Sequence, residues 1–332
     1  MLRALHPIFC AQAADRARLP GLPRGKLIFA ARWAVTVLAF WVILHSIDLG
    51  AMVDLIGRAE PLALGVAGVV VIAQFAVLVW RWQLVIHILG GKAVGFGPLA
   101  LLLGHSFLIG QVLPSSVGGD VARTVLLSRL TGAVAAARSV ICDRLLGFAA
   151  LALLAVPVIA EMIGTITPLL TLAICALGAM TAVALVLAYS LTYGLPWLGR
   201  HVATVADDLR ITLRSGKIGL LAMALGIGSS LLGVLLIYII GSAIGADLRA
   251  LDCLVLVPPA LLVSALPISL GGWGVREGAL VAAFSLVHAD PAAVAATSVM
   301  FGLTTPLVGA IAAAIALLPG MGDIAMGYRN GG

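Results

Sequence analysis

Two similar stretches of this chain combine an arginine with paired glycines and a proline in strongly apolar surroundings. Residues 113–123 read LPSSVGGDVAR, and residues 266–276 read LPISLGGWGVR. Proline, glycine and arginine each loosen a helix or cost free energy in lipid, so they rarely occur together in one apolar segment. Their presence in both halves is typical of transporters with internal repeats and broken helices around a central site.

The chemistry that these stretches predict is anion binding. Gly118 and Gly119, like Gly271 and Gly272, precede an expected helix start, where free backbone N–H groups and the helix dipole favour an anion. An arginine follows about one turn later in each stretch, and a guanidinium holds phosphate through two parallel hydrogen bonds. We therefore predict a basic, partly hydrated pocket near mid-membrane, suited to phospholipid headgroups or polyprenyl phosphates.

A purely structural role is the alternative for the two arginines, Arg123 and Arg276. Proline and glycine would then only bend helices, and each arginine would pair with a nearby acid. Asp120 lies three residues from Arg123, a spacing at which helical side chains form ion pairs. Glu277 is a counter-ion for Arg276 or a proton carrier. A bend alone does not explain an arginine at the same offset twice.

Further polar residues are candidates for the same pocket. Ser116 and Ser269 hold matching places in the two stretches. Asp143 and Arg144 either mark the start of a membrane span or face the cavity. Arg81 has a tryptophan on each side, so it is either an interfacial anchor or a ligand.

The composition identifies an integral membrane protein. Hydrophobic residues make up 62% of the chain, charged residues only 10%, and the mean hydropathy is +1.17, unlike any soluble domain of this length. The net charge of +6 does not indicate nucleic-acid binding, because basic residues in flanks and loops set topology and meet anionic headgroups. We expect no metal or cofactor, since the histidines and cysteines lack metal-ligand spacing. The four cysteines are expected to be small core residues.

Apolar segments predict an all-α polytopic fold with about six full transmembrane helices and two re-entrant or broken hairpins, eight hydrophobic helical units in all. The expected spans are 28–47, 62–86, 139–160, 166–190, 218–242 and 293–318. The expected hairpins have first arms 97–113 and 252–266, turns at 114–119 and 267–272, and a second return arm at 273–288. An amphipathic helix is expected at 196–215.

Charge sets the expected orientation. A basic N-terminal tail (1–27), followed after the first span by an acidic loop (48–60), places the N-terminus in the cytoplasm. A full span at 97–113 would leave the following arginines outside, whereas a hairpin keeps them inside. His105 and Gln111 lie in this arm and could face the cavity.

The remaining boundaries follow from this topology. We expect a single membrane domain at 28–318 and a cytoplasmic C-terminal tail at 319–332. The units at about 62–160 and 218–318 would form an inverted internal repeat.

The two stretches and the Asp143–Arg144 pair resemble the lysylphosphatidylglycerol synthase transmembrane family, also called flippase-like proteins. The resemblance covers roughly 28–318. The family includes the membrane part of the bacterial multiple peptide resistance factor, which moves aminoacylated phosphatidylglycerol between leaflets. It also includes stand-alone proteins linked to hopanoid and other glycolipid pathways. The resemblance implies a bacterial cytoplasmic (inner) membrane protein of lipid metabolism.

The leading hypothesis is a flippase-like transporter, not an enzyme, that moves an anionic phospholipid, an aminoacylated lipid or a lipid-linked precursor. No nucleotide-binding loop occurs, so movement would be passive or ion-driven. Lysyl transfer is not expected, because the chain ends at Gly332 without the soluble transferase domain of the resistance factor. The alternatives are a non-catalytic accessory of a lipid-biosynthetic enzyme and an integral-membrane lipid-modifying enzyme. The sequence leaves the oligomeric state open.

Overall fold

The computed structural model describes residues 49–112, 118–163, 196–265, 269 and 272–317. These residues are helical apart from short connections, with one 3₁₀ turn, η1 (Ser285–Val287). The predicted all-α class is therefore confirmed. The expected spans 28–47 and 166–190, and the tails 1–27 and 319–332, lie outside the described residues.

The helices of the first half begin with α3 (Leu49–Gly57), which occupies part of the segment expected to be an acidic loop. It is followed by α4 (Pro61–Ile88), α5 (Phe96–Val112), α6 (Gly118–Thr131) and α7 (Ala133–Ile163). The second half contains α9 (Pro196–Arg214), α10 (Lys217–Ala243), α11 (Ala250–Ser264), α12 (Val275–Phe284) and α13 (Pro291–Ala316).

Three helices, α4, α10 and α13, are long and apolar enough to cross a membrane. They confirm the helices predicted at 62–86, 218–242 and 293–318, and the span predicted at 139–160 lies within α7. By contrast, α5 and α11 are apolar but have only 17 and 15 residues. At about 1.5 Å per residue, each falls short of the roughly 30 Å hydrocarbon core.

Local signals explain where the long helices begin. Pro61 and Pro291 occupy the first turns of α4 and α13, where a missing N–H leaves no helical hydrogen bond unmade. The Asp290 side chain accepts hydrogen bonds from the backbone N–H groups of Ala292 and Ala293, and so caps α13. Gly216, at φ 65°, separates α9 from α10.

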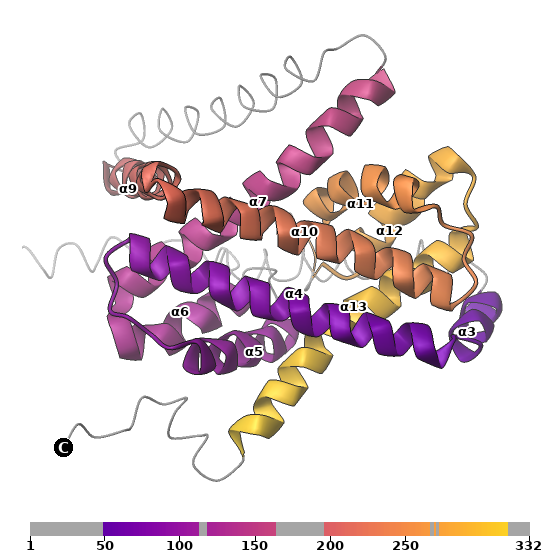
Figure 1. The fold of residues 1–332 in the computed structure, drawn as a ribbon, viewed down its shortest axis with the longest axis horizontal. Helices are drawn as coiled ribbons and strands as arrows, with labels where there is room; N and C mark the ends of the chain where they lie inside the picture. The colour runs from indigo at the N-terminus through magenta and orange to yellow at the C-terminus, as the bar shows by residue number, and fades with distance from the viewer. Residues whose placement is uncertain (1–48, 113–117, 164–195, 266–268, 270–271, 318–332) are drawn as a thin grey trace, which may run out of the picture.

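The long helices α4 and α10 pack side by side and run in opposite directions (Figure 1). At one end the Glu60 N–H, which precedes α4, donates to the carbonyl of Ala243 at the end of α10, at 2.7 Å. In the middle the Gln74 side-chain amide donates to the Ser229 carbonyl at 3.0 Å. Helices α5, α7, α9, α11 and α13 pack against this antiparallel pair.

Each half contains an antiparallel helical hairpin. In the first, Leu103 of α5 packs with Leu127 of α6, and at the other end a side chain on Gly110 would lie 3.2 Å from the Gly119 backbone. In the second, residues of α11 such as Leu256 pack with Leu280 of α12. The α5–α6 hairpin lies toward one end of the α4–α10 pair and the α11–α12 hairpin toward the other (Figure 1).

The packing partners of the two halves match in order. Helix α5 packs on α13 and α11 packs on α7, while α6 packs on α7 and α12 on α13. Each hairpin therefore lies against the last long helix of both its own half and the other half.

The predicted amphipathic helix is confirmed as α9, but its packed face is not simply the apolar stripe. Asp208, almost fully buried, accepts two hydrogen bonds from Arg138 of α7. Leu209 joins a small core with residues of α4, α7 and α10, whereas Leu213 is half exposed. Cys142 packs in that core, and it and Cys253 are buried free thiols, as predicted. Cys10 and Cys175 lie outside the described residues.

We predict that Arg138→Ala weakens the attachment of α9. The change leaves the buried Asp208 carboxylate without its cation, which costs about 2–3 kcal/mol because the Arg138 end of the pair is partly solvated. Thermal unfolding in detergent should show a lower Tm than for the wild type. Arg129→Ala, at an exposed position without an ion pair among the described residues, is the control and should leave the Tm unchanged.

Candidate functional site

A cavity of about 270 Å³ lies between the α5–α6 hairpin and the α11–α12 hairpin. The first stretch contributes Gly119, Asp120 and Arg123, and the second contributes Gly272 and Arg276. The walls are completed by Ser106, Phe107, Gly110, Gln111, Arg144, Ser264, Ala265 and Thr305. The two arginines that the sequence paired by position therefore line one cavity.

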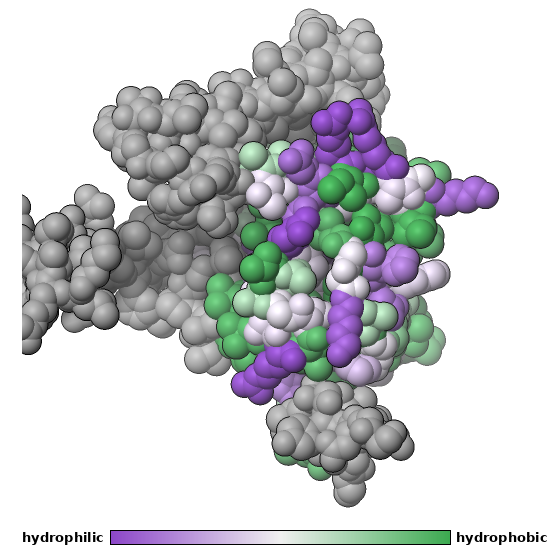
Figure 2. All heavy atoms as spheres, turned by 90° about the vertical axis from the view of Figure 1, so that its left-hand side faces the viewer, coloured by the Kyte–Doolittle hydropathy of each residue, from purple (hydrophilic) through white to green (hydrophobic). Residues whose placement is uncertain are grey.

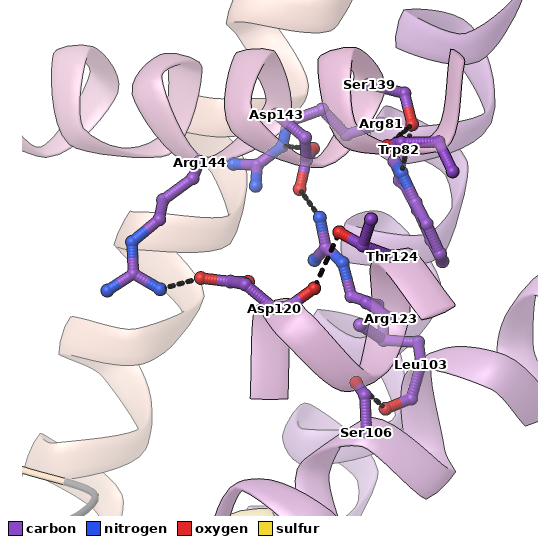
Figure 3. A network of polar contacts seen from close by, with 11 residues as sticks. Arg81, Trp82, Leu103, Ser106, Asp120, Arg123, Thr124, Ser139, Asp143 and Arg144 are labelled. Carbon is purple, nitrogen blue, oxygen red and sulfur yellow. Dashed lines mark hydrogen bonds and ion pairs between the residues drawn. The ribbon is translucent and has the colours of Figure 1, made fainter. Parts of the chain in front are cut away.

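Arg123 shares a buried carboxylate with a second arginine (Figure 3). Its Nη2 donates to Asp143 Oδ2 at 3.0 Å, and Nε of Arg81 donates to Asp143 Oδ1 at 2.8 Å. All three side chains are at least nine-tenths buried. One negative charge thus serves two positive charges, and the group carries an excess of one positive charge.

The remainder of the Arg123 guanidinium is held by an aromatic ring. Its Cζ lies 4.3 Å from the ring centroid of the buried Trp82, a cation–π distance. Its Nε is buried and has no hydrogen-bond partner among the described residues. A buried donor without a partner is costly, so this N–H is suited to an acceptor that arrives with a ligand.

Asp120 and Arg144 form a second ion pair at the cavity wall (Figure 3). The Arg144 guanidinium also lies 5.2 Å from the Phe148 ring centroid. The intrahelical Asp120–Arg123 pair considered from the sequence is therefore wrong. Both residues pair instead with α7, because the hairpin packs this face of α6 against that helix.

Arg276 and Glu277 form a third, buried pair. Nη2 and Nε of Arg276 donate to Glu277 Oε1 at 2.6 and 3.1 Å, so the predicted counter-ion role of Glu277 is confirmed. The other carboxylate oxygen accepts the Gly274 N–H at 2.6 Å. The start of α12 is therefore occupied by the protein's own carboxylate, and the Ser298 hydroxyl donates to it as well.

The helix starts of the two stretches differ. Helix α6 begins at Gly118, whereas α12 begins three residues after Gly272. Gly272 and Gly274 adopt φ values of +81° and +80°, which only glycine adopts readily and which delay the second helix. The expectation that both pairs of glycines precede a helix start holds for the second stretch only.

Several contacts of Arg276 come from residues that the sequence did not single out. Its guanidinium lies 4.7 Å from the Trp273 ring centroid, and the Trp273 indole N–H donates to Gln111 of α5 at 3.0 Å. Gly302 of α13 leaves room for the guanidinium, since a Cβ there would lie 1.9 Å from Nη2. The sequence did contain a signal for Gly302, because a glycine inside a long helix lowers helix stability and so suggests that a neighbouring group needs the space.

The structure gives the burial and helix position of three candidates for which the sequence left an interfacial reading open. Arg81 is buried beside Asp143 and does not line the cavity, so it is neither an exposed anchor nor a wall residue. Asp143 and Arg144 lie ten residues or more inside α7, not at its start. Gln111 does line the cavity, whereas His105 makes a packing contact, with Nδ1 2.6 Å from the Leu101 carbonyl oxygen.

The remaining candidates are placed as follows. Gly118 is buried, and Gly119 lies so close to α5 that an added Cβ would be 3.1 Å from the Ser106 carbonyl oxygen. Ser269 is fully buried, and its hydroxyl has no partner among the described residues. Ser116 and Gly271 lie outside the described residues.

Four charged residues line the cavity and three more lie behind its walls, and the formal charges of the seven do not cancel. The arginines are Arg81, Arg123, Arg144 and Arg276, and the acids are Asp120, Asp143 and Glu277. Two pairs are neutral, so the excess positive charge belongs to the Arg81–Asp143–Arg123 group. A monoanion such as a phosphate diester would neutralise it.

Fold and site together define an all-helical, multi-pass membrane protein with a basic cavity between two helical hairpins. The sequence model of the lysylphosphatidylglycerol synthase TM region matches residues 29–313. The chain belongs to this family, which confirms the resemblance and indicates a membrane function related to lipids. None of the curated proteins matches the chain.

We predict that Gly302→Ala displaces the Arg276 guanidinium. The new methyl group would overlap Nη2, and repacking a buried site of this kind costs about 1–3 kcal/mol. The Tm in detergent should therefore fall. Gly228→Ala is the matched control: it also lies inside a long helix, but nothing stands within 4 Å of its added Cβ. An equal fall in both variants would contradict the packing role of Gly302.

Proposed function

We propose that this protein moves an anionic membrane lipid between the two leaflets of the bilayer. The observation that carries the proposal is the excess positive charge of the Arg81–Asp143–Arg123 group, with one unpartnered guanidinium N–H, in a cavity lined by both halves. An aminoacylated lipid or a lipid-linked precursor would present the same phosphate chemistry.

The site acts by replacing the water around a phosphate. The Arg123 guanidinium would donate to a phosphate oxygen through an N–H group that Asp143 does not occupy, while Asp143 keeps its bond to Arg81, so binding neutralises the group without breaking it. The cavity, at about 270 Å³, is slightly smaller than typical ligand sites, which span roughly 300–1,000 Å³. It accommodates a headgroup, and the acyl chains stay in the bilayer.

The architecture supports movement by alternating access. We infer that α4–α7 and α10–α13 are inverted repeats, because α4 and α10 are antiparallel and the packing partners match in order. In this arrangement α5–α6 and α11–α12 are re-entrant hairpins that enter from opposite sides and meet at the cavity. Rocking of one repeat against the other would open the cavity to each leaflet in turn.

The ends of the described helices differ in charge, and this supports the proposed orientation. One end carries Lys92, Arg129, Arg138, Arg210, Arg214 and Lys217 against Asp207 and Asp208. The other carries Asp54, Glu60, Asp247, Asp252 and Asp290 against Arg58 and Arg249. By the positive-inside rule the basic end is cytoplasmic. We place the protein in the bacterial inner membrane with both termini in the cytoplasm.

Transport agrees with the site better than catalysis or a purely accessory role. The three carboxylates around the cavity are each bonded to arginine, so none is arranged as a general base or as part of a metal site. Helix α9, which could have served a partner enzyme, is tied to its own bundle through the buried Asp208.

Arg123→Gln should abolish most lipid movement while the protein stays folded. It removes the excess charge and the free donor, yet Asp143 keeps Arg81 as its partner. Losing one charge-assisted hydrogen bond of about 1.5–3 kcal/mol should slow transfer of fluorescent phosphatidylglycerol in proteoliposomes about tenfold or more. Arg129→Gln, on the same helix but exposed, should transfer at the wild-type rate.

The second stretch needs a paired change, because Arg276→Gln alone would leave buried Glu277 without a cation. Arg276→Gln/Glu277→Gln removes the pair as a unit and should also slow transfer. Failure of the folded wild type to move any lipid, with and without an ion gradient, would contradict the proposal and favour the accessory role.

The orientation is tested with single cysteines in a variant that lacks the four native ones. An impermeant maleimide should label Leu251→Cys, at the start of α11, in intact cells. It should label Arg129→Cys, near the end of α6, only after the membrane is permeabilised. Labelling of Arg129→Cys from outside would mean that α5 crosses the membrane completely.

A further inference from the structure

A second pocket, of about 580 Å³, lies at the basic end of the molecule and shares no residue with the central cavity. It is formed where the end of α4 meets α9 and the start of α10. Its walls include His87, Ile88, Arg210, Ile211, Arg214 and Ile218. The charged cavity already described does not use any of these side chains.

The cations of this pocket are available to a ligand. Arg210 and Arg214 lie one turn apart on α9, are exposed, and form no ion pair with a described residue. No carboxylate lines the pocket, since Asp208 faces Arg138 on the other side of the helix. Two guanidinium groups at this spacing can bind one phosphate from two sides.

The apolar walls point to a ligand that also has hydrocarbon. Three isoleucines, Ile88, Ile211 and Ile218, stand beside the arginines, one from each helix. On the adjoining helix surfaces Trp80, seven residues before His87, and Leu221, three residues after Ile218, are exposed at 45% and 38%. Figure 2 looks onto this end, where hydrophilic and hydrophobic side chains alternate over the surface. The end of two apolar helices is the depth at which lipid headgroups lie.

We propose that this pocket is a peripheral site for an anionic phospholipid of the cytoplasmic leaflet. Arg210 and Arg214 bind the headgroup phosphate, and the acyl chains lie along the exposed apolar surfaces of α4 and α10. The site anchors α9 to the membrane and is independent of transport through the central cavity. It explains why α9 keeps an unpaired basic face although Asp208 secures its other face to the bundle.

The test is native mass spectrometry of the full chain from micelles that contain equal amounts of phosphatidylglycerol and phosphatidylcholine. Wild-type protein should retain phosphatidylglycerol preferentially, and Arg210→Gln/Arg214→Gln should bind it about tenfold more weakly. Lys92→Gln/Arg129→Gln is the matched control, with the same charge change at exposed positions of the same end. Arg123→Gln should keep the peripheral lipid, which separates this site from the transport site.

Three results would overturn the proposal. Undiminished retention of phosphatidylglycerol by Arg210→Gln/Arg214→Gln would show that the pocket is not the binding site. An equal loss in the control variant would show that retention depends only on the general surface charge. Thermal stabilisation by inorganic phosphate alone, equal to that by phosphatidylglycerol and lost in the pocket variant, would assign the site to free phosphate instead of lipid.

Discussion

The cost of removing charge from water is the constraint on which this structure depends. Four arginines and three carboxylates lie in the centre of an otherwise apolar helical protein. Each would be prohibitively unstable alone in lipid, so each is paired and hydrogen-bonded. Asp143 is the clearest case, because it is bonded to arginines from two other helices, α4 and α6. The hairpins are needed to bring these partners together at one depth.

Pairing is not complete, and the incomplete part is where function is expected. In the first half one positive charge is in excess, and the Nε–H group of Arg123 has no hydrogen-bond partner among the described residues. In the second half the Glu277 carboxylate accepts hydrogen bonds from Arg276, from the Gly274 N–H and from the Ser298 hydroxyl. The halves are alike in sequence but differ chemically: in the proposed function the first binds an external anion, whereas the second already holds the internal carboxylate of Glu277.

The basic end of the molecule repeats this principle at the surface. The buried Asp208 of α9 pairs with the partly exposed Arg138 of α7. Arg210 and Arg214 of α9 have no ion-pair partner among the described residues. Charges at this depth remain partly hydrated, so leaving them unpaired costs little and favours contact with anionic headgroups. Central and peripheral arginines thus suit the same phosphate chemistry at very different desolvation costs.

The sequence alone determined the membrane class, the positions of α4, α10 and α13, and the placement of Arg123 and Arg276 at one cavity. Hydropathy and the repeated stretch report these features because they depend on local composition and spacing. Pairing was decided by tertiary structure. Asp120 pairs with Arg144 of α7 and not with Arg123, which is nearer in the sequence. Arg81 lies in the core beside Asp143, although the sequence also allowed a position at the membrane interface. These ion pairs depend on the distances between side chains on different helices. The spacing of residues along one helix does not determine which faces of α4, α6 and α7 pack together.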